Sequence, residues 1–547
     1  MDVTNLMGLL GGLALFLYGM QMMSTGLEDA AGNKMKVILE KLTANRLVGV
    51  LVGALITAII QSSSATTVMV VGFVNSKMMT LKQAVWIIMG ANIGTTITGQ
   101  LIALDVGEIA PVMAFLGVAA VVFLKNEKVH HIGEILAGLG ILFIGMDMMG
   151  SAMKPLADMP EFVNLLTKFE NPVLGILVGA VFTAIIQSSS ASVGILQALA
   201  GSGVIGLRGA AFVLFGQNIG TCITAFLASI GTNTNAKRTT VIHIMFNVIG
   251  TIIFTILCLV TPLISLMEGM TPGNAPAQIA NLHTIFNVGT SIVLLPVGGY
   301  LTRLATMILR EKKGEEEESL RIKYLLDIKH INTDKLGAAF VCMEGIKQEV
   351  SRMLEMAVEN VHSSFSIFAK GDDKEYKDLE KREEYVDFLN KEISKYITLA
   401  VSSEHTKSGA KVFNSMFTIT SNVERISDHA TNIAGYSKII GEKKIVFSRN
   451  AQEELLEMQK ICDEMFAILR QKPEDMIKWH ERIACMEQKI DDMTAACRVN
   501  MYDRIQKGIC SDEGSILFAE MLVDFERIGD HALNISGEIL KIAMVEK

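Results

Sequence analysis

The sequence is poor in residues that cross-link small domains. Its 547 residues include seven cysteines, an odd number with no Cys-x-x-Cys pair. Neither a disulfide framework nor a cysteine zinc site is therefore predicted. Four of the cysteines lie within 462–510, a charged helical region, which fits a reducing cytosol.

Charged residues are scarce in the first 310 positions, where 15 Lys or Arg and 13 Asp or Glu make up 9%. In the other 237 positions, 34 basic and 44 acidic residues make up 33%. This asymmetry and the length exclude a single globular domain, and the acidic second part argues against a nucleic-acid partner. The chain is predicted to join a membrane part to a soluble part.

Long apolar runs fill the first part. The N-terminus lacks the basic patch and cleavage site of a signal peptide, so the run 6–27 is predicted to be a retained membrane helix. The other long runs are 108–124, 132–150, 241–264 and 282–309. The run 47–60 is too short for the roughly 20 residues that cross a bilayer, and it ends at Gln61-Ser62-Ser63-Ser64-Ala65-Thr66-Thr67.

The same polar cluster returns 126 positions later, as Gln187-Ser188-Ser189-Ser190-Ala191-Ser192. Between 45–65 and 171–191, 15 of 21 residues are identical. The same offset relates Gly-Ala-Asn-Ile-Gly-Thr at 90–95 to Gly-Gln-Asn-Ile-Gly-Thr at 216–221. A duplication is therefore predicted, with repeat 1 at about 5–125, repeat 2 at about 131–250, and further helices to 310.

The matched clusters indicate a binding site. In hydrocarbon, a Gln, Ser and Thr cluster that interrupts an apolar run must face protein, ions or water. Broken helices at matched positions of duplicated halves are typical of transporter sites, and their N-termini offer free N–H groups to an anion. The predicted anion ligands are Gln61, Ser62, Ser63, Ser64, Gln187, Ser188, Ser189 and Ser190.

Neither cluster contains Lys or Arg. A divalent anion held by neutral donors in a low-dielectric site needs compensation, which co-bound cations supply. Oxygen ligands from hydroxyls, amides and unwound carbonyls suit Na⁺, and the Gly-flanked asparagines lie on segments where the backbone can unwind to give a second layer of oxygen ligands. The predicted sodium ligands are Thr66, Thr67, Asn92, Thr95, Thr96, Ser192, Asn218 and Thr221.

Several polar residues keep alternative interpretations. Asp147 is either a cation or proton site or a helix-end residue. His243 and His283, each in His-x-x-Phe-Asn, are predicted to be packing or helix-end groups. A serine-rich turn can also serve close helix packing, although its repetition favours binding. Neither cluster has the Gly-x-Ser-x-Gly form of a serine hydrolase, and the protein is not predicted to be an enzyme.

The second part is predicted to be a helical bundle. A charged linker, 311–334, precedes residues 335–547, and from 320 onward the chain has one proline, Pro473, with apolar residues at helical spacing. About six helices are expected. The segment 424–433 matches 526–535, which suggests two three-helix units. The fold class is therefore all-α in both parts.

Carboxylates four residues apart share one face of a helix, and this part has four such Glu and Asp pairs. If the pairs converge, they would hold a cluster of iron, manganese, magnesium or zinc. Solvated ion pairs are the alternative, above all for the pairs at 383 and 487. The predicted metal ligands are Glu383, Asp387, Glu424, Asp428, Glu487, Asp491, Glu526 and Asp530, with Asn432 and Asn534 continuing two of the faces.

Together the repeated Gln-Ser-Ser-Ser, Gly-x-Asn-Ile-Gly-Thr and His-x-x-Phe-Asn motifs resemble the bacterial type II sodium/phosphate cotransporters, over about 5–310. Residues 335–547 are similar to the PhoU domain, a helical phosphate-regulation module whose family binds multinuclear metal clusters. The resemblance implies inverted repeats with inorganic phosphate and sodium between the two clusters. It also implies a multi-pass protein of the inner (plasma) membrane with a cytoplasmic regulatory domain and a transition-metal cluster.

The favoured function is sodium-coupled phosphate symport under control of the PhoU-like domain. The alternatives are a membrane-tethered phosphate sensor without turnover and a transporter of another oxyanion such as sulfate. A matched pair of broken helices favours transport, because an anchor has no use for them. Ser192-Val193 stands where the first repeat has Thr66-Thr67, so the halves cannot coordinate sodium identically. The predicted partners are phosphate and the lipid bilayer, without nucleic acid. The sequence is also compatible with a homo-oligomer.

Overall fold

The computed structural model describes residues 3–31, 45–104, 107–124, 126–157, 159, 168–310, 320–326, 336–370, 373–401, 407–471 and 473–546. Within these ranges every regular element is a helix, which confirms the all-α prediction. The chain forms two compact units, 1–313 with 326–341 and 314–325 with 342–547. Most of the predicted linker, 311–334, lies outside the described residues.

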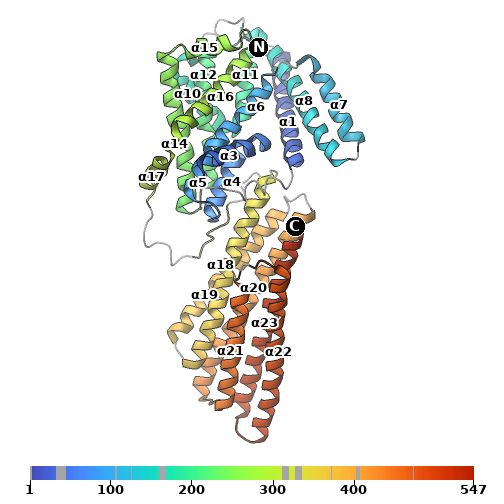
Figure 1. Cartoon of the computed structure of the whole chain (residues 1–547), viewed down its shortest axis with the longest axis vertical. Coiled ribbons are helices and arrows are strands. Elements are labelled where there is room, and N and C mark those ends of the chain that lie inside the picture. The colour runs from blue at the N-terminus through green and yellow to red at the C-terminus, as the bar shows by residue number, and fades with distance from the viewer. Residues whose placement is uncertain are drawn as a thin grey trace. The chain divides into compact units, whose positions relative to one another are not determined.

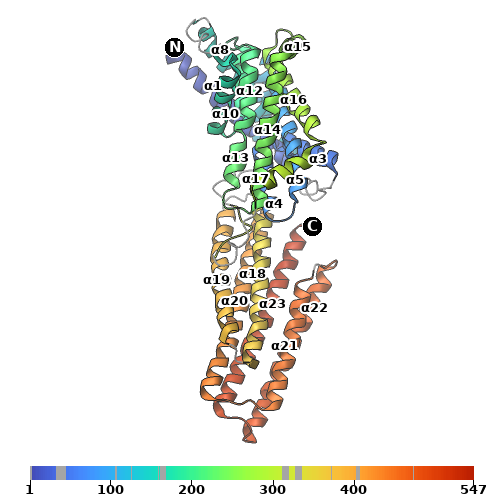
Figure 2. The same ribbon diagram turned by 90° about the vertical axis from the view of Figure 1, so that its left-hand side faces the viewer.

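The first unit is built from short and long helices whose order repeats (Figure 1, Figure 2). Its elements are α1 (Val3–Ala31), α3 (Arg46–Ile60), α4 (Ser63–Asn75), α5 (Leu81–Gly94), α6 (Thr96–Ile102), η1 (Gly107–Ile109), α7 (Ala110–Phe123), α8 (Glu127–Ala157), η2 (Lys168–Glu170), α10 (Pro172–Ile186), α11 (Ser189–Gly201), α12 (Leu207–Gly220), α13 (Cys222–Ala228), α14 (Thr234–Val260), α15 (Leu263–Met270), α16 (Ala275–Leu294) and α17 (Gly298–Ile308).

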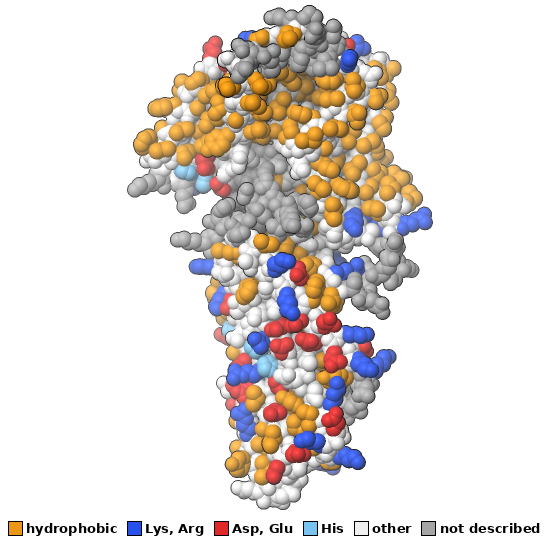
Figure 3. Space-filling model, turned by 180° about the vertical axis from the view of Figure 1, so that it is seen from behind, with side chains coloured by type: hydrophobic (Ala, Val, Ile, Leu, Met, Phe, Trp, Pro, Cys, Tyr) orange, Lys and Arg blue, Asp and Glu red, His pale blue; other side chains and the backbone are white. Residues whose placement is uncertain are grey.

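This unit has the surface of a membrane protein. Hydrophobic side chains cover much of the face of it seen in Figure 3, and Phe115, Phe123 and Ile185 are each more than 70% exposed. Within the described residues, five helical stretches are long and apolar enough to cross a bilayer. They are Thr4–Leu27, Leu81–Ile102, Lys128–Pro155, Leu207–Ala228 and Thr234–Val260.

Two predicted apolar runs are not simple spans. The run 282–309 is divided between α16 and α17, which are bent by 83°. Pro296 lies in the break, where its missing N–H cannot continue the helix. The run 108–124 forms mainly the 14-residue helix α7. In contrast, 81–102 and 207–228, whose apolar character is interrupted by polar motifs, are long enough to span.

Within each repeat, a glycine brings two helices into backbone contact, and the two contacts are equivalent. A Cβ on Gly90 of α5 would lie 2.0 Å from the carbonyl oxygen of Val50 in α3. A Cβ on Gly216 of α12 would likewise lie 2.0 Å from the carbonyl oxygen of Ile176 in α10. Only glycine permits this distance, so the duplicated sequence builds the same helix pair twice.

Helices α1 and α8 show how the repeats are related. Gly12 packs on Gly145 and Gly19 packs on Gly138, so the two helices are antiparallel. The 126-residue offset takes Gly12 to Gly138 and Gly19 to Gly145, which converts one contact into the other. Equivalent helices therefore run in opposite directions about a local twofold axis. This confirms the inverted topology that the resemblance implied.

The second unit contains six long helices in its described part, as predicted (Figure 2). They are α18 (Leu336–Lys370), α19 (Asp373–Val401), α20 (Lys407–Lys443), α21 (Arg449–Leu469), α22 (Met476–Gln506) and α23 (Asp512–Glu546). Apolar residues at helical spacing form the core, where the rings of Phe365 and Phe525 stack with centroids 5.0 Å apart.

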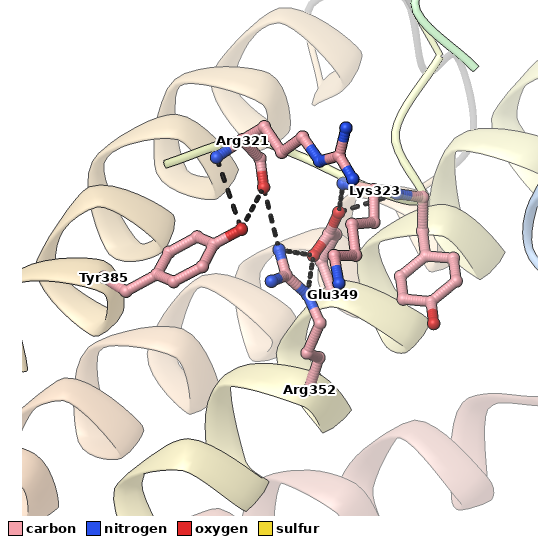
Figure 4. A network of polar contacts seen from close by, with 6 residues as sticks. Arg321, Lys323, Glu349, Arg352 and Tyr385 are labelled. Carbon is pink, nitrogen blue, oxygen red and sulfur yellow. Dashed lines mark hydrogen bonds and ion pairs between the residues drawn. The ribbon is translucent and has the colours of Figure 1, made fainter. Parts of the chain in front are cut away.

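A short segment, 320–325, is fixed to α18 and α19 by a polar network (Figure 4). The fully buried Glu349 accepts hydrogen bonds from the backbone N–H groups of Lys323 and Tyr324, the latter at 2.7 Å. Its other oxygen accepts from Arg352 at 2.7 Å. Arg352 and the Tyr385 hydroxyl both donate to the carbonyl of Arg321, at 3.1 and 2.9 Å. The buried carboxylate is thus paired and hydrogen-bonded, which offsets its desolvation.

Replacing Glu349 with Gln should lower the stability of the protein by about 2 kcal/mol, because charge-assisted bonds to Arg352 and to two N–H groups become neutral or are lost. Thermal unfolding of the purified full chain checks this. The matched control is Glu355→Gln, an exposed position on the same helix, which should change stability by less than about 0.5 kcal/mol. Equal melting temperatures for the two variants would contradict the importance of the network.

Candidate functional site

Both predicted helix breaks are present and have the same backbone. After α3, Gln61 adopts the left-handed conformation at φ 55° and Ser62 is extended, and α4 then begins at Ser63. After α10, Gln187 has φ 59°, Ser188 is extended and α11 begins at Ser189. The hydroxyls of Ser62 and Ser188 cap the new helices by accepting from the N–H groups three residues later, at 3.2 and 3.3 Å.

The two breaks meet at the local twofold axis. The Oγ atoms of Ser63 and Ser189, equivalent residues of the two repeats, are 3.4 Å apart. The Thr95 hydroxyl donates to Ser63 Oγ at 3.3 Å. All three side chains are buried. Two helix N-termini that are 126 residues apart in the sequence therefore converge on one point inside the unit.

This point carries unused hydrogen-bond donors. Within the described residues, the backbone N–H groups of Ser63, Ser64, Ser189 and Ser190 have no hydrogen-bond partner. The first turn of a helix leaves such groups free, and the helix dipole is positive there. Hydroxyls and N–H groups from both halves are thus gathered among buried, neutral side chains. Such a set of groups favours an anion.

Polar side chains next to the breaks differ between the halves. In the first, Thr57 donates to Thr66 Oγ1 at 3.0 Å, and Thr98 donates to Gln61 Oε1 at 2.7 Å. Thr66 and Thr67 donate to the carbonyls of Ser62 and Ser63, at 3.1 and 2.9 Å. In the second, Ser192 donates to the Ser188 carbonyl at 2.8 Å, and Gln217 donates to that of Ser192 at 3.0 Å. The two sets of oxygen atoms are not equivalent.

The predicted unwinding at the Gly-flanked asparagines is wrong. Asn92 and Asn218 lie within α5 and α12 and donate to the carbonyls four residues earlier, each at 2.9 Å. Thr95 and Thr221 keep right-handed helical angles at the junctions that follow. The flanking glycines serve the close packing on α3 and α10 instead. Thr96 donates to the Ile93 carbonyl at 2.8 Å, whereas the buried Thr221 Oγ1 has no partner among the described residues.

His283 lies closer to the site than the sequence indicated. Its Nε2 is 3.3 Å from Asn218 Oδ1, so the residue predicted to serve packing contacts a predicted sodium ligand. His243 is fully buried, and neither ring nitrogen has a partner within the described chain.

Thr57, Thr98 and Gln217 were missed as members of this polar layer. Thr57 and its equivalent Thr183 are both fully buried within the identical stretch of the two repeats, so a threonine repeated in an apolar run was the available signal. Gln217 is aligned with Ala91, and nothing in the duplication indicated its contact with the Ser192 carbonyl.

Asp147 is not part of the serine site. Its exposed side chain lines a cavity of about 280 Å³ with Lys154, Gln197 and Ser202. Gln197 lies eight residues along α11 from Ser189, roughly 12 Å at the helical rise. Asp147 lies ten residues before the end of α8, so it is not a helix-end residue, and its role as a cation or proton site stays a prediction.

The eight predicted metal ligands of the second unit form two groups. On α19 and α20, ligand oxygens of Glu383, Asp387 and Asp428 lie within 4.8 Å of one another. Burial, with the neighbouring carboxylates, raises the pKa values of Glu383 and Glu424 above their ordinary range. On α22 and α23, burial and repulsion among Glu487, Asp491, Glu526 and Asp530 raise the pKa values of Glu487 and Asp491. Unfavourable proximity of carboxylates is what a divalent cation relieves.

The Asp-His-x-x-Asn parts of the duplicated motif contact the opposite half of the second unit. His429 Nδ1 lies 2.7 Å from Asp524, and Asn432 donates to the same oxygen at 3.3 Å. The equivalent His531 Nδ1 lies 2.8 Å from Asn422, which is equivalent to Asp524. The two imidazole rings stack with centroids 5.6 Å apart. Asn432 and Asn534 continue the two helical faces by one turn, as predicted, and their amides bond across the interface between the halves.

Comparison with known proteins agrees with this architecture. Residues 15–151 and 146–261 match the family model of the Na⁺/Pi-cotransporter, and residues 350–436 match the PhoU domain. "Uncharacterized protein YqeW" of Bacillus subtilis is 34% identical over 303 residues, which cover 55% of this chain and 97% of YqeW. The chain belongs to the Na⁺/Pi-cotransporter family. Each of the two family matches contains one of the Gln-Ser-Ser-Ser breaks.

Other similar proteins of this group carry names related to phosphate. "Putative inorganic phosphate export protein YjbB" of Salmonella typhimurium is 24% identical over 468 residues, 85% of this chain and 84% of YjbB. The human "Sodium-dependent phosphate transport protein 2B" is 37% identical over 109 residues, 19% of this chain and 16% of that protein. No solved structure matches the chain.

Proposed function

We propose that this family member is a sodium-coupled phosphate symporter of the inner membrane, regulated by its PhoU-like domain on the cytoplasmic side. The observation that carries the proposal is the meeting of two helix N-termini at Ser63 and Ser189. A tetrahedral oxyanion accepts hydrogen bonds on all its oxygens, and four N–H groups and several hydroxyls converge there. The membership in the Na⁺/Pi-cotransporter family supports phosphate as that anion.

In this proposal the serines of both clusters and the two glutamines bind phosphate. Ser63 and Ser189 donate from the axis, and the N–H groups of Ser64 and Ser190 donate from the helix ends. Ser62 and Ser188 also fix the two helix ends, because their hydroxyls cap α4 and α11. The side chain of Gln61 is held in place because its Oε1 accepts a hydrogen bond from the Thr98 hydroxyl.

Sodium ions would compensate the charge of the anion. The oxygen atoms of Thr66, Thr67, Asn92, Thr95 and Thr96 surround the first break, and those of Ser192, Asn218 and Thr221 surround the second. The unpartnered, buried Thr221 Oγ1 supports a cation on the second side. Because the two sets differ, the two sides should bind sodium with different affinities.

Phosphate export is a second candidate for the direction of transport. The similarity to the YjbB proteins supports it, because this similarity extends over both units of the chain. Import and export would use the same site, and the gradients in the cell would decide between them.

Uptake of radiolabelled phosphate into proteoliposomes tests the proposal. With an inward sodium gradient, we expect accumulation above equilibrium, and potassium in place of sodium should abolish it. Accumulation without sodium dependence would contradict coupling. No phosphate flux in either direction, with binding retained, would favour the sensor, and flux of labelled sulfate alone would favour another oxyanion.

The cluster of carboxylates on α19 and α20 should make the stability of the protein depend on pH and on bound metal. Raised pKa values mean that the folded state binds protons more tightly than the unfolded state, so this stability is present at acid pH and is lost as the pH rises through the raised values. In chelator, the melting temperature should fall between pH 4.5 and 7, and Mn²⁺ should restore it at pH 7.

Replacing Asp428 with Asn should raise the melting temperature in chelator at pH 7 and remove most of the Mn²⁺ effect, because one repelling charge and one ligand are lost. The control is Glu464→Gln, an exposed carboxylate on α21 outside both groups. An Asp428→Asn variant that Mn²⁺ stabilises as much as the parent would return these carboxylates to a solvated charged face.

A further inference from the structure

A second set of metal-ligating side chains lies in the first unit, where the end of α1 meets the start of α8. Oxygen and nitrogen atoms of Asp29, His131 and Glu134 lie within 4.8 Å of one another. His131 and Glu134 are three residues apart on α8, so they share one helical face. Gly26, one turn before Asp29, packs on the backbone of His131, which allows this close approach.

The spacing of the atoms does not fit closed ion pairs. His131 Nδ1 is 3.6 Å from Glu134 Oε2 and 4.0 Å from Asp29 Oδ2. A histidine and carboxylate in contact close to about 2.7–2.9 Å, as His429 and Asp524 do at 2.7 Å in the second unit. Both His131 Nδ1 and Glu134 Oε2 are buried and have no hydrogen-bond partner within the described residues.

The 3.6 Å separation of His131 Nδ1 from Glu134 Oε2 is that of two ligands around a metal ion, and the 4.0 Å separation from Asp29 Oδ2 is slightly longer. Two ligands at about 2.0–2.2 Å from a tetrahedral ion are roughly 3.3–3.6 Å apart, so small side-chain shifts would bring all three atoms to one centre. One imidazole and two carboxylates suit zinc or manganese, and the ion would neutralise two acidic groups. His130 Nε2 lies 3.5 Å from the other oxygen of Glu134 and can orient that ligand.

The cluster is not a by-product of the duplication. The 126-residue offset places Asn5, Gly8 and Pro155 at the positions equivalent to His131, Glu134 and Asp29. At that other end of the same helix pair, Gly8 simply packs near the Cβ of Ala152. One end of the α1 and α8 pair therefore has three metal ligands, and its symmetry equivalent has none.

We propose that Asp29, His131 and Glu134 bind a divalent transition-metal ion that links α1 to α8. The ion fixes the two helices that lie across the twofold axis from each other. This site is separate from the carboxylate groups of the second unit and from the serine site.

The number of zinc ions bound per purified full chain tests the site. The parent protein for this test is the Asp387→Asn, Asp428→Asn double variant. These substitutions weaken metal binding by the carboxylate cluster on α19 and α20 of the second unit. His131→Gln and Asp29→Asn should each bind one zinc fewer per chain than this parent, whereas His362→Gln, whose side chain is 67% exposed, should lose none. Zinc should also raise the melting temperature of the parent and of His362→Gln more than that of the other two variants.

X-ray absorption at the zinc edge gives a second readout. We expect imidazole scattering in the parent that decreases in His131→Gln. Unchanged zinc content in both His131→Gln and Asp29→Asn would overturn the proposal. The three side chains would then be only a loosely spaced set of charged groups. If His131→Gln does not fold, Asp29→Asn decides, because its side chain is 39% exposed near the end of α1 and its loss should be tolerated.

Discussion

Replacing Ser63 and Ser189 together with alanine should raise the KM for phosphate about 100-fold and leave the fold intact. Each hydroxyl is expected to donate one hydrogen bond to a charged oxyanion, and such a bond contributes about 1.5–3 kcal/mol. Each single variant should therefore raise the KM about tenfold. The two hydroxyls contact each other across the axis, so the effects of the single variants should be similar.

The measurement is initial uptake in proteoliposomes over a range of phosphate concentrations at fixed sodium. The matched control is Ser76→Ala, a buried serine at the other end of α4 whose hydroxyl bonds the Phe73 carbonyl. This variant should keep the KM of the parent. A double Ser63 and Ser189 variant with unchanged KM, in protein of normal melting temperature, would remove these residues from the phosphate site.

Replacing Gly90 with Ala should destabilise the membrane unit by at least about 3 kcal/mol. The added Cβ would lie 2.0 Å from the Val50 carbonyl oxygen, and backbone atoms of two packed helices cannot move aside individually. Gly216→Ala should have the same effect through Ile176, and the two substitutions together should prevent recovery of folded protein.

Thermal unfolding in detergent and the yield of monodisperse protein check this prediction. Gly299→Ala is the control, because its Cβ meets no atom within 4 Å in α17, and helix propensity should make it neutral or slightly stabilising. If Gly90→Ala melts like Gly299→Ala, the close contact of α3 and α5 does not exist in the folded protein.

The sequence was most informative where polar residues interrupt an apolar run. Gln61 and Ser62 follow a run too short to span, and no helix through an apolar layer could bury them without partners. The break was therefore predictable, and so was its repetition. Sequence spacing says nothing about which breaks meet in space, so only the family resemblance implied that the two clusters face each other, and the direct contact of Ser63 with Ser189 came from the structure.

Glycine was the main source of error. In Gly-x-Asn-Ile-Gly-Thr it could permit unwinding or close packing, and both rest on the missing Cβ. Only the distance from Gly90 to the Val50 carbonyl decides between them. The second unit shows a similar limit, since Asp524 and Asn422 are ordinary helix residues until the halves are packed. Their contacts with His429 and His531 connect residues about 100 positions apart.

The inverted pairing of the repeats has a consequence for how the site opens. The first break is braced by the bonds from Thr57 to Thr66 and from Thr98 to Gln61, whereas the equivalent Thr183 hydroxyl of the second half has no partner among the described residues. The second break is held by different bonds, from Ser192 to the Ser188 carbonyl and from Gln217 to the Ser192 carbonyl. Because the halves are related by a twofold axis, an exchange of their conformations would give a state that faces the opposite side of the bilayer. We expect alternating access to arise from this exchange, with the serines on the axis as the part that moves least.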